Sequence, residues 1–291
     1  MTRVQNRILP LFLAPALLML LVFTVLPALW SIYVSFTNLA LTGPNALNYK
    51  IIGLANFIRL FKDGDFYHSI NLTLLYTLFT IIGQFILGMG AALLLSRRKF
   101  RAKAFLLAII ILPMVIPNII QALMWSSMLG NGNFGTLNRI VGLVGMAPVS
   151  WTQQLPLLSV VLINFWNNSG FAMILFLAGF ESISQDVLES GQMDGANGYQ
   201  MLIHIKIPLI RYVIMLWLLL NTIGCMGVFD LVYALTRGGP GDATEILGIY
   251  IYNQGFRYYE LGYGSAASLV LLFICLGLSY FYLRLMHVDL E

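Results

Sequence analysis

The sequence predicts an all-α integral membrane protein with six transmembrane helices. Hydrophobic residues make up 59% of the 291 residues and charged residues only 10%, with a mean hydropathy of +0.84. A soluble domain usually has about 25% charged residues. Six apolar runs are also each long enough, at roughly 20 residues, to cross a hydrocarbon core of about 30 Å.

The predicted spans follow one another along a single transmembrane domain that covers residues 1–291. They lie at about 8–36, 69–96, 104–129, 155–180, 209–229 and 265–285. The first apolar run is too long for the core of a secretory signal and is not followed by a small-residue cleavage site, so we expect it to be retained. Pro113 and Pro117 fall inside the third run. Membrane helices tolerate proline where neighbouring segments satisfy the freed backbone groups.

Lys and Arg predict the orientation of the chain. The second connection carries five cations within seven residues, namely Arg97, Arg98, Lys99, Arg101 and Lys103, and Arg3 and Arg7 precede the first span. Because short cytoplasmic loops are enriched in Lys and Arg, we expect both termini in the cytoplasm, residues 184–208 inside and residues 230–264 outside. These cations stand at membrane boundaries, so the pI near 9.1 does not indicate nucleic-acid binding.

The chain has no recognisable energy source or catalytic centre of its own. It contains no phosphate-binding G-x-x-x-x-G-K-[ST] motif, no hydrolase motif and no Cys/His cluster with metal-ligand spacing. Cys225 and Cys275 both fall within predicted spans, and no acidic residue lies deep in an apolar run. The sequence therefore predicts neither an enzyme nor a metal site. It leaves a passive pore or a subunit that another protein drives.

A polar, glycine-containing segment separates the fourth and fifth spans. Ser184 is a candidate N-cap for a short helix over 185–190, which we expect Gly191 and Gly195 to interrupt. Asn197, followed three residues later by Gln200, has the form of a capping box and predicts a second helix. Met201, Leu202 and Ile205 give that helix one apolar stripe, which we expect to end at Pro208. The predicted product is a rigid two-helix element.

This segment resembles the loop by which permeases of bacterial binding-protein-dependent ABC importers dock onto their ATPase. The family pattern E-A-A-x-x-D-G-A, followed by I-x-L-P, is matched at Glu189, Asp194, Gly195, Ala196, Ile205, Ile207 and Pro208. Ser190 and Gly191 stand where alanines are usual, and Gly191 should loosen the first helix by up to about 1 kcal/mol. The resemblance implies that 189–197 is a coupling helix seated in a groove of the ATPase. Its contact residues would be Glu189, Ser190, Gly191, Asp194, Gly195, Ala196 and Asn197.

Three further patterns resemble permeases for di- and oligosaccharides, including those for maltose and glycerol phosphate. They are Gly53-Leu54-Ala55-Asn56-Phe57, Trp125 with Gly135 and Asn138, and Leu235-Thr236-Arg237-Gly238-Gly239-Pro240. The last pattern indicates the first of two permease subunits. Two glycines and a proline also suit a sharp turn, so a structural role and a sugar contact both remain open for it. The likeness extends over about 12–285.

The resemblance implies a type I ABC importer permease fold in the inner membrane of a prokaryote. The expected partners are membrane lipid, a second permease, two ATPase subunits and an extracytoplasmic sugar-binding protein. ATP and Mg would bind the ATPase, and this chain would hold no cofactor. The subunit would move a sugar inward by alternating access. The alternative is a self-contained channel or facilitator for small polar solutes, in which the loop is incidental.

Polar and aromatic residues within spans are candidates for a solute path. The fourth span contributes Asn164, Trp166, Asn167, Asn168 and Phe171, and the fifth contributes Asn221, Gly224, Cys225 and Val228. Asn168, Phe171, Cys225 and Val228 are included because the resemblance places sugar-contacting positions there. Amides in hydrocarbon are costly unless paired. The competing interpretation is that these amides, with Gln84 and Gln121, only form hydrogen bonds between helices.

Overall fold

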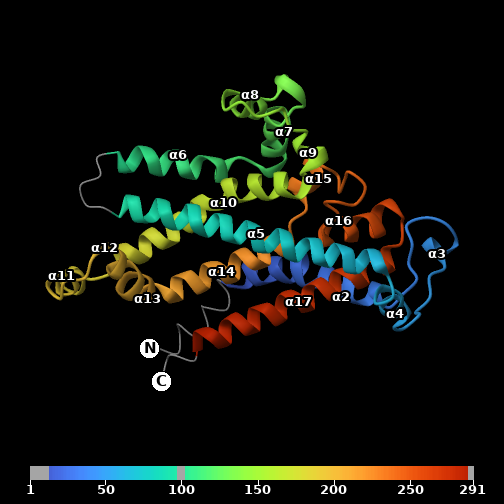
Figure 1. Cartoon of the computed structure of the whole chain (residues 1–291). Coiled ribbons are helices and arrows are strands. Elements are labelled where there is room, and N and C mark those ends of the chain that lie inside the picture. Colours follow the sequence, from blue (N-terminus) through green and yellow to red (C-terminus); the bar gives the residue numbers. More distant parts are fainter. Residues whose placement is uncertain (1–12, 97–101, 288–291) are drawn as a thin grey trace, which may run out of the picture. The chain divides into compact units, whose positions relative to one another are not determined.

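The computed structural model describes residues 13–96 and 102–287, and in these ranges the chain is built almost entirely of helices (Figure 1). The β pairing reported for this part of the chain is one isolated bridge between Thr37 and Ile51. The start of the predicted first span, residues 8–12, lies outside the described residues. So do residues on which the predicted orientation rests, namely Arg3, Arg7, Arg97, Arg98, Lys99 and Arg101.

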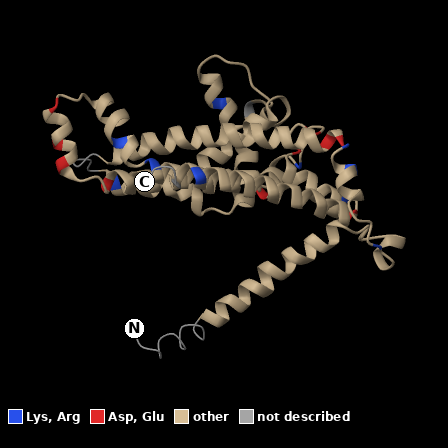
Figure 2. Cartoon of the chain, turned by 90° about the horizontal axis from the view of Figure 1, so that it is seen from below, with Lys and Arg blue, Asp and Glu red and all other residues tan. Residues whose placement is uncertain are grey.

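Four helices are long and apolar enough to cross a membrane unbroken. They are Leu13–Ser35, which contains η1 (Leu21–Val25) and α2 (Leu26–Ser35), then α5 (Gly64–Leu95), α10 (Pro156–Glu181) and Leu261–Met286 within α17 (Leu261–His287). They lie close to the predicted first, second, fourth and sixth spans. Charged residues of these helices lie near the helix ends, and the connections carry most of the remaining charge (Figure 2).

The third apolar run is broken into two helices. α6 (Lys103–Val115) and α7 (Asn118–Met128) meet at an angle of 102°. The break falls on Ile116 and Pro117, which both have extended backbone angles, ψ 129° and 139°. The ring of Pro117 disfavours a helical conformation at the residue before it, so Ile116 leaves the helix. The run at 104–129 is therefore not the continuous helix that its composition suggests.

The side chain of Gln121 donates hydrogen bonds to two carbonyls beside this break. In an unbroken helix the carbonyl of Pro113 would accept from the N–H of residue 117, but proline has none. That carbonyl instead accepts from the N–H of Ile116 at 3.1 Å and from Gln121 Nε2, which also donates at 2.9 Å to the carbonyl of Ile116. Asn167 Nδ2 of α10 donates to Gln121 Oε1 and so holds the amide in place. A polar pair thus stabilises the bend.

The fifth apolar run is also preceded by a bend. α12 (Gly198–Gln200), η3 (Met201–Lys206) and α13 (Ile207–Leu209) form one helical stretch, which meets α14 (Arg211–Met226) at 68°. Pro208 lies in the first turn of α13, and the stretch ends one residue after it, at Leu209, close to the predicted end. Proline is tolerated at the start of a helix, and the π-helical turn before it already departs from regular pairing.

The described chain divides into two compact units. The first contains residues up to 66 together with 250–273, and the second contains 67–249 with 274 onward. In the first unit, α3 (Pro44–Leu47) and α4 (Ala55–Leu60) follow the first span, and η4 (Asn253–Arg257) precedes α17. Asn56 is buried and its Nδ2 donates to the carbonyls of Ser35 and Thr37. The asparagine of the G-L-x-N-F pattern therefore shapes this loop.

Asp63, which follows α4, is hydrogen-bonded to Tyr250 and to Tyr263 in the first turn of α17. Its Oδ2 accepts hydrogen bonds from the hydroxyls of Tyr250 at 2.7 Å and Tyr263 at 2.8 Å. Burial acts to raise the pKa of Asp63, but hydrogen bonds from these hydroxyls and from two backbone N–H groups lower it, and its pKa lies below the ordinary value. Burial raises the pKa of Tyr250, which keeps its hydroxyl protonated as a donor.

We expect the Asp63 carboxylate to make stability depend on pH. Because the folded pKa is depressed, the stabilisation is complete above the unfolded value of about 3.9 and is lost as pH falls through the lower folded value. The thermal midpoint of the wild-type protein should therefore fall below about pH 4, and Asp63→Asn should lack that part of the decrease. Asp65→Asn is the matched control, because Asp65 is exposed. Equal pH profiles for wild type and Asp63→Asn would contradict the assignment.

The second unit contains two hydrophobic cores. The first joins α5, α7, α10, α14 and α15 (Asp230–Leu235), with Tyr76, Ile163 and Val232 among its buried members. The second contains an aromatic group in which the rings of Phe85, Phe176 and Trp217 lie 5.2–5.9 Å apart between centroids. The two cores pack α10 against its neighbours along most of its length.

Small residues allow the helices of this unit to approach closely. A side chain at Gly88 of α5 would overlap Ala172 of α10, and a Cβ at Gly170 would lie 2.7 Å from the carbonyl oxygen of Ile110 on α6. Close backbone approach through glycine and alanine is a common source of affinity between membrane helices. The packing of α5, α6 and α10 thus depends on positions where no larger residue fits.

Polar side chains organise the connections of the second unit. The 130–155 connection holds η2 (Gly132–Phe134), α8 (Thr136–Leu143) and α9 (Trp151–Gln154), and buried Asn138 bonds to several of its backbone groups. In the G-G-P turn, Gly238 has φ +92°, and Thr244 Oγ1 bonds to Thr236 Oγ1 at 2.7 Å and to the carbonyl of Gly239 at 3.0 Å. These contacts favour the structural interpretation of both patterns. α16 (Leu247–Tyr252) follows this turn.

Candidate functional site: a two-helix element and the helices behind it

The first helix of the polar segment is α11 (Gln185–Met193). Ser184 occupies the predicted N-cap position with extended backbone angles, but its side chain makes no capping hydrogen bond. The expected interruption at Gly191 is wrong, because the helix continues for two more residues and Gly191 is buried within it. The helix is therefore longer than its glycine suggested.

Gly195 ends this helix in a left-handed conformation, with φ +80°. The N–H of Gly195 donates to the carbonyl of Gln192 at 3.1 Å, and the N–H of Ala196 donates to that of Gly191 at 3.0 Å. These two bonds form a Schellman motif, which satisfies carbonyls that the helix end would leave free. Backbone geometry favours glycine here, because a side chain at positive φ is strained.

The second helix begins with the predicted capping box, which is confirmed. Asn197 Oδ1 accepts from the N–H of Gln200, and Gln200 Oε1 accepts from the N–H of Asn197, both at 2.9 Å. Only two residues, Gly195 and Ala196, therefore lie between the Asp194 that ends the first helix and the Asn197 that starts the second. Both ends are fixed by hydrogen bonds, which makes the connection stiff.

Gly191 is the contact point between the two helices. A Cβ at this position would lie 2.5 Å from Ile205 Cδ1 and 3.1 Å from Met201 Cε. Gly191 thus leaves the space that Ile205 and Met201 occupy, so the two helices pack directly against each other. The departure from the family's usual alanine is matched by larger side chains on the facing helix. We call residues 184–209 the two-helix element.

We expect Gly191→Ala and Ile205→Val to compensate for each other. Alanine should strengthen the helix by up to about 1 kcal/mol, but its methyl group would collide with Ile205 Cδ1. Ile205→Val alone should lower the free energy of unfolding by about 1 kcal/mol through the lost methyl group. In the Gly191→Ala background the same substitution should raise it. Thermal midpoints of the four proteins measure this double-mutant cycle, and additive effects would exclude the contact.

The two-helix element is packed onto the helices behind it. Leu202 and Ile210 join the second core, and Lys206 Nζ lies 5.9 Å from the ring centre of Phe180 at the end of α10. Nearby, Lys103 Nζ forms an ion pair with Glu181 and so joins the start of α6 to the end of α10. Movement of the element would therefore be passed directly to α10 and α14.

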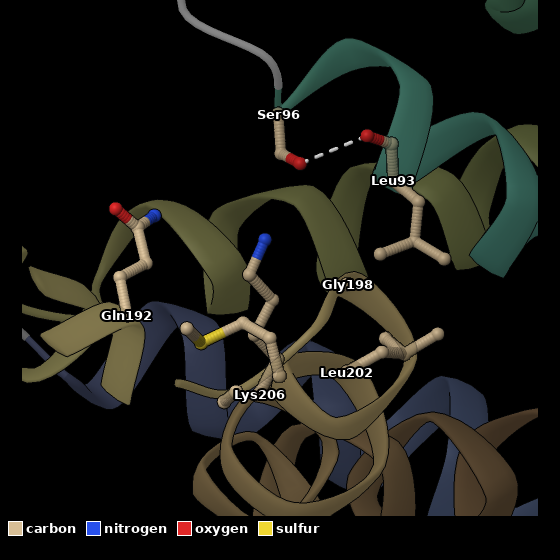
Figure 3. Close-up of a pocket in the computed structure, with 8 residues that line it drawn as sticks. Leu93, Ser96, Gln192, Gly198, Leu202 and Lys206 are labelled. Atoms are coloured by element: carbon tan, nitrogen blue, oxygen red, sulfur yellow. Dashed lines mark hydrogen bonds between the residues drawn. The ribbon is translucent and has the colours of Figure 1, made fainter. Parts of the chain in front are cut away.

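A pocket of about 500 Å³ lies between the element and the end of α5. Figure 3 shows its lining, to which Leu93 and Ser96 come from the end of α5 and Gln192 and Lys206 from the element. Ser96 Oγ donates to the carbonyl of Leu93 at 3.0 Å. The element is thus attached along α10 and α14 and separated from α5 by open space.

The exposed face of the element contains most of the predicted contact residues. Glu189, Ser190, Asp194, Gly195 and Asn197 are exposed, Ala196 is half-buried, and Gly191 is buried on the opposite side. Two large apolar side chains also stand on this exposed part, Met193 at 83% exposure and Tyr199 at 71%. Neither residue was among the contact residues predicted from the sequence. Both are large apolar residues outside the apolar stripe that each helix buries. Their position off that stripe could have predicted that they are exposed.

The candidate path residues of α10 divide by burial. Asn164 and Asn167 are buried, Asn168 and Phe171 are half-buried, and Trp166 is 49% exposed beside a pocket of about 170 Å³. Asn167 bonds to Gln121, which corresponds to the interhelical role that the sequence left open. Asn164 Oδ1 accepts from Gln84 Nε2 at 3.0 Å, and Asn168 Nδ2 lies 3.4 Å from the same oxygen.

The candidate path residues on and after α14 also differ in burial. Cys225 is buried in the first core, and Val228 packs against that core from a half-buried position. Asn221 is half-buried and its Nδ2 donates to the carbonyl of Trp217 at 3.1 Å, whereas Gly224 is exposed. Asn168 and Asn221 are thus the amides with partial access in this conformation.

Comparison with known proteins places these features in a family. The family model described as "binding-protein-dependent transport system inner membrane component" matches residues 84–287. The trehalose/maltose transport system permease protein of Thermococcus litoralis is 32% identical over 94% of this chain and 92% of its own length. The sn-glycerol-3-phosphate transport system permease protein of Brucella suis biovar 1 is 32% identical over 96% of this chain and 94% of its own length.

The fold has a close counterpart among solved structures. A chain from the crystal structure of a bacterial alginate ABC transporter, in complex with an alginate pentasaccharide-bound periplasmic protein, superimposes with a TM-score of 0.83. The two chains are 22% identical, and the match covers 97% of this chain and 95% of the other. This likeness confirms the predicted all-α permease fold. Sequence and fold together assign this chain to the family of inner membrane components of binding-protein-dependent transport systems.

Proposed function

We propose that this chain is the permease subunit of an ATP-driven importer that moves a sugar across the inner membrane of a prokaryote by alternating access. The observation that carries the proposal is the two-helix element, which is stiff at its turn, exposed on one face and packed onto α10 and α14 on the other. Such an element transmits a push from a bound partner into the helices that carry the candidate path. A flexible loop would absorb it.

The exposed face of the element is proposed as the docking surface for an ATPase subunit. Met193 and Tyr199 are suited to act as its anchors, because Met and Tyr are enriched at the centres of protein interfaces. Glu189 would pair with a basic group of the partner, and its Oε1 already accepts a hydrogen bond from Gln185 at 2.7 Å. The ATP and Mg would be held by the two ATPase subunits, and a second permease would complete the pore.

A sugar is the proposed cargo because the names of similar permeases give trehalose and maltose, sulfoquinovosyl glycerol or glycerol 3-phosphate as the transported solute. An extracytoplasmic binding protein would deliver it from the side of residues 230–264. The amides Asn168 and Asn221 can both donate and accept hydrogen bonds, as binding of sugar hydroxyls requires. Trp166 and Phe171 add aromatic surface on the same helix as Asn168.

We expect Asn168→Ala to lower sugar uptake about fivefold or more while the thermal midpoint stays unchanged, because one weak hydrogen bond to Asn164 is lost and a solute contact is removed. Asn167→Ala should act mainly on stability. It removes the support of Gln121 at the α6–α7 break and should lower the thermal midpoint. Normal uptake by Asn168→Ala would remove this residue from the path.

Reconstitution tests the proposal as a whole. The chain should co-purify from detergent with an ATPase and a second permease. In liposomes that complex, given its binding protein, should take up radiolabelled trehalose, maltose or glycerol 3-phosphate only when ATP is enclosed. A self-contained channel or facilitator predicts instead a homo-oligomer that equilibrates these solutes without ATP, and that result would replace the proposal.

A further inference from the structure

One face of α5 carries a row of buried polar side chains that the sequence analysis noted only at Gln84. The row, which we call the α5 polar face, consists of Ser69, Thr73, Thr77, Thr80 and Gln84, and none of them is more than 6% exposed. Their separations of three and four residues put them on one side of the helix. At the N-terminal end the groups are paired. Thr73 Oγ1 donates to the carbonyl of Ser69 at 2.6 Å and accepts from the N–H of Leu247 at 2.8 Å.

Most polar atoms of the remaining part of the α5 polar face have no partner in the described chain, although Gln84 Nε2 is bonded to Asn164. Thr77 Oγ1, Thr80 Oγ1 and Gln84 Oε1 are buried and have no hydrogen-bond partner among the described residues. The hydroxyl of Tyr76, which lies near that of Thr80, is also buried and has no hydrogen-bond partner among the described residues. A buried polar atom without a partner loses its hydration and gains nothing in return. Packing alone would be served better by Val or Ala at these positions.

These atoms lie next to the candidate path. Gln84 Nε2 donates to Asn164 of α10, which Asn168 also approaches. Tyr76 lies beside Cys225 of α14 and belongs to the same core. Gln84 and Tyr76 of α5 therefore face the two helices that carry the candidate solute contacts, and Thr80 lies one helical turn from each of them. Their uncharged hydroxyl and amide groups can donate and accept hydrogen bonds, which suits a neutral polyhydroxylated solute.

We propose that Thr77, Thr80 and Gln84 form a further wall of the solute path, which is closed in this conformation and meets water and solute hydroxyls in another conformation of the transport cycle. This inference rests on the proposed function. It explains why polar atoms are retained at positions where they are unpaired here, because their partners arrive only when the helices separate.

Isosteric substitutions separate a path from a packing defect. Valine has the shape of threonine without the hydroxyl, so Thr77→Val with Thr80→Val should raise the thermal midpoint by removing unpaired groups. If these hydroxyls serve the path, trehalose or maltose uptake by the same protein should fall about tenfold, the equivalent of one lost hydrogen bond to the solute. A raised midpoint with unchanged uptake would overturn the inference.

Accessibility gives a second test that does not depend on the solute. In the full complex, Thr80→Cys should react with a membrane-impermeant thiol reagent, beyond the labelling of the parent protein, only during ATP turnover with the binding protein present. Ala122→Cys, at a fully buried position of α7, is the control and should stay unlabelled. Absence of labelling at position 80 during active uptake would overturn the inference alone. Absence of any ATP-dependent uptake by the parent would overturn the proposed function, and the inference with it.

Discussion

Replacing Gly195 by Asp should release the ATPase subunits and abolish ATP-driven uptake. Gly195 lies on the exposed face of the two-helix element, next to the exposed carboxylate of Asp194. A second carboxylate there would be desolvated on docking without a matching partner, which costs about 3–5 kcal/mol. The ATPase should therefore bind about 100-fold more weakly or worse. Co-purification of the ATPase and uptake in liposomes measure the two effects.

Gly195→Asn is the matched control for this substitution. Asparagine has the shape of aspartate without its charge and adopts the left-handed conformation more readily than most residues. A Cβ at this position meets no heavy atom within 4 Å, so the cost to the fold is the strain of the positive φ, which the Asp and Asn variants share. Gly195→Asn should keep the ATPase bound. Intact uptake and full ATPase binding by Gly195→Asp would show that docking takes place elsewhere.

Replacing Asn138 by Ala should give the largest loss of stability outside the membrane-spanning helices. Asn138 Nδ2, which has two hydrogens, lies within hydrogen-bond distance of the carbonyls of Gly130, Gly132 and Val149, and its Oδ1 accepts from the N–H of Val149 and from Trp151 Nε1. Alanine would leave these groups unpaired in a connection where Asn138 is 2% exposed. We expect a loss of about 2–4 kcal/mol. The thermal midpoint should fall by roughly 5–15 °C.

Two variants show whether this loss comes from the hydrogen bonds. Asn131→Ala removes an exposed asparagine from the same connection and should leave the midpoint unchanged. Asn138→Asp keeps the accepting oxygen but places a buried carboxylate beside carbonyl oxygens that lose their donor, so at neutral pH it should be at least as unstable as Asn138→Ala. Equal midpoints for the two alanine variants would contradict the assigned role. Uptake by Asn138→Ala at a permissive temperature should be normal, because the residue lies outside the candidate path.

Local sequence rules predicted the parts of the site that depend on neighbouring residues. The capping box of Asn197 and Gln200 needs only residues three positions apart, and it forms as predicted. The N-cap position of Ser184 was also predicted correctly, although its side chain makes no capping bond. Long apolar runs identified α5, α10 and α17 because hydropathy over some 20 residues is a strong signal for a membrane helix.

Distant contacts decided the features that the sequence analysis did not predict correctly. Gly191 was expected to interrupt a helix, because glycine has a low helix propensity, but Ile205 and Met201 pack against it and hold the helix intact. The third run was read as one span, and only the structure shows that Gln121 and Asn167 support a bend of 102° there. No rule that considers residues close in sequence contains these partners.

The sequence by itself determined that the chain crosses a membrane and where most of its long helices lie, because hydropathy acts over a few turns of chain. The likeness of one segment to a docking loop came from its match to a family pattern. The tertiary structure alone decided which polar side chains are paired. Asn167 has a partner in Gln121, while Thr77 and Thr80 have none in the described chain. Hydrogen bonding in a membrane bundle depends on which helix faces join, and residues far apart in sequence set those faces.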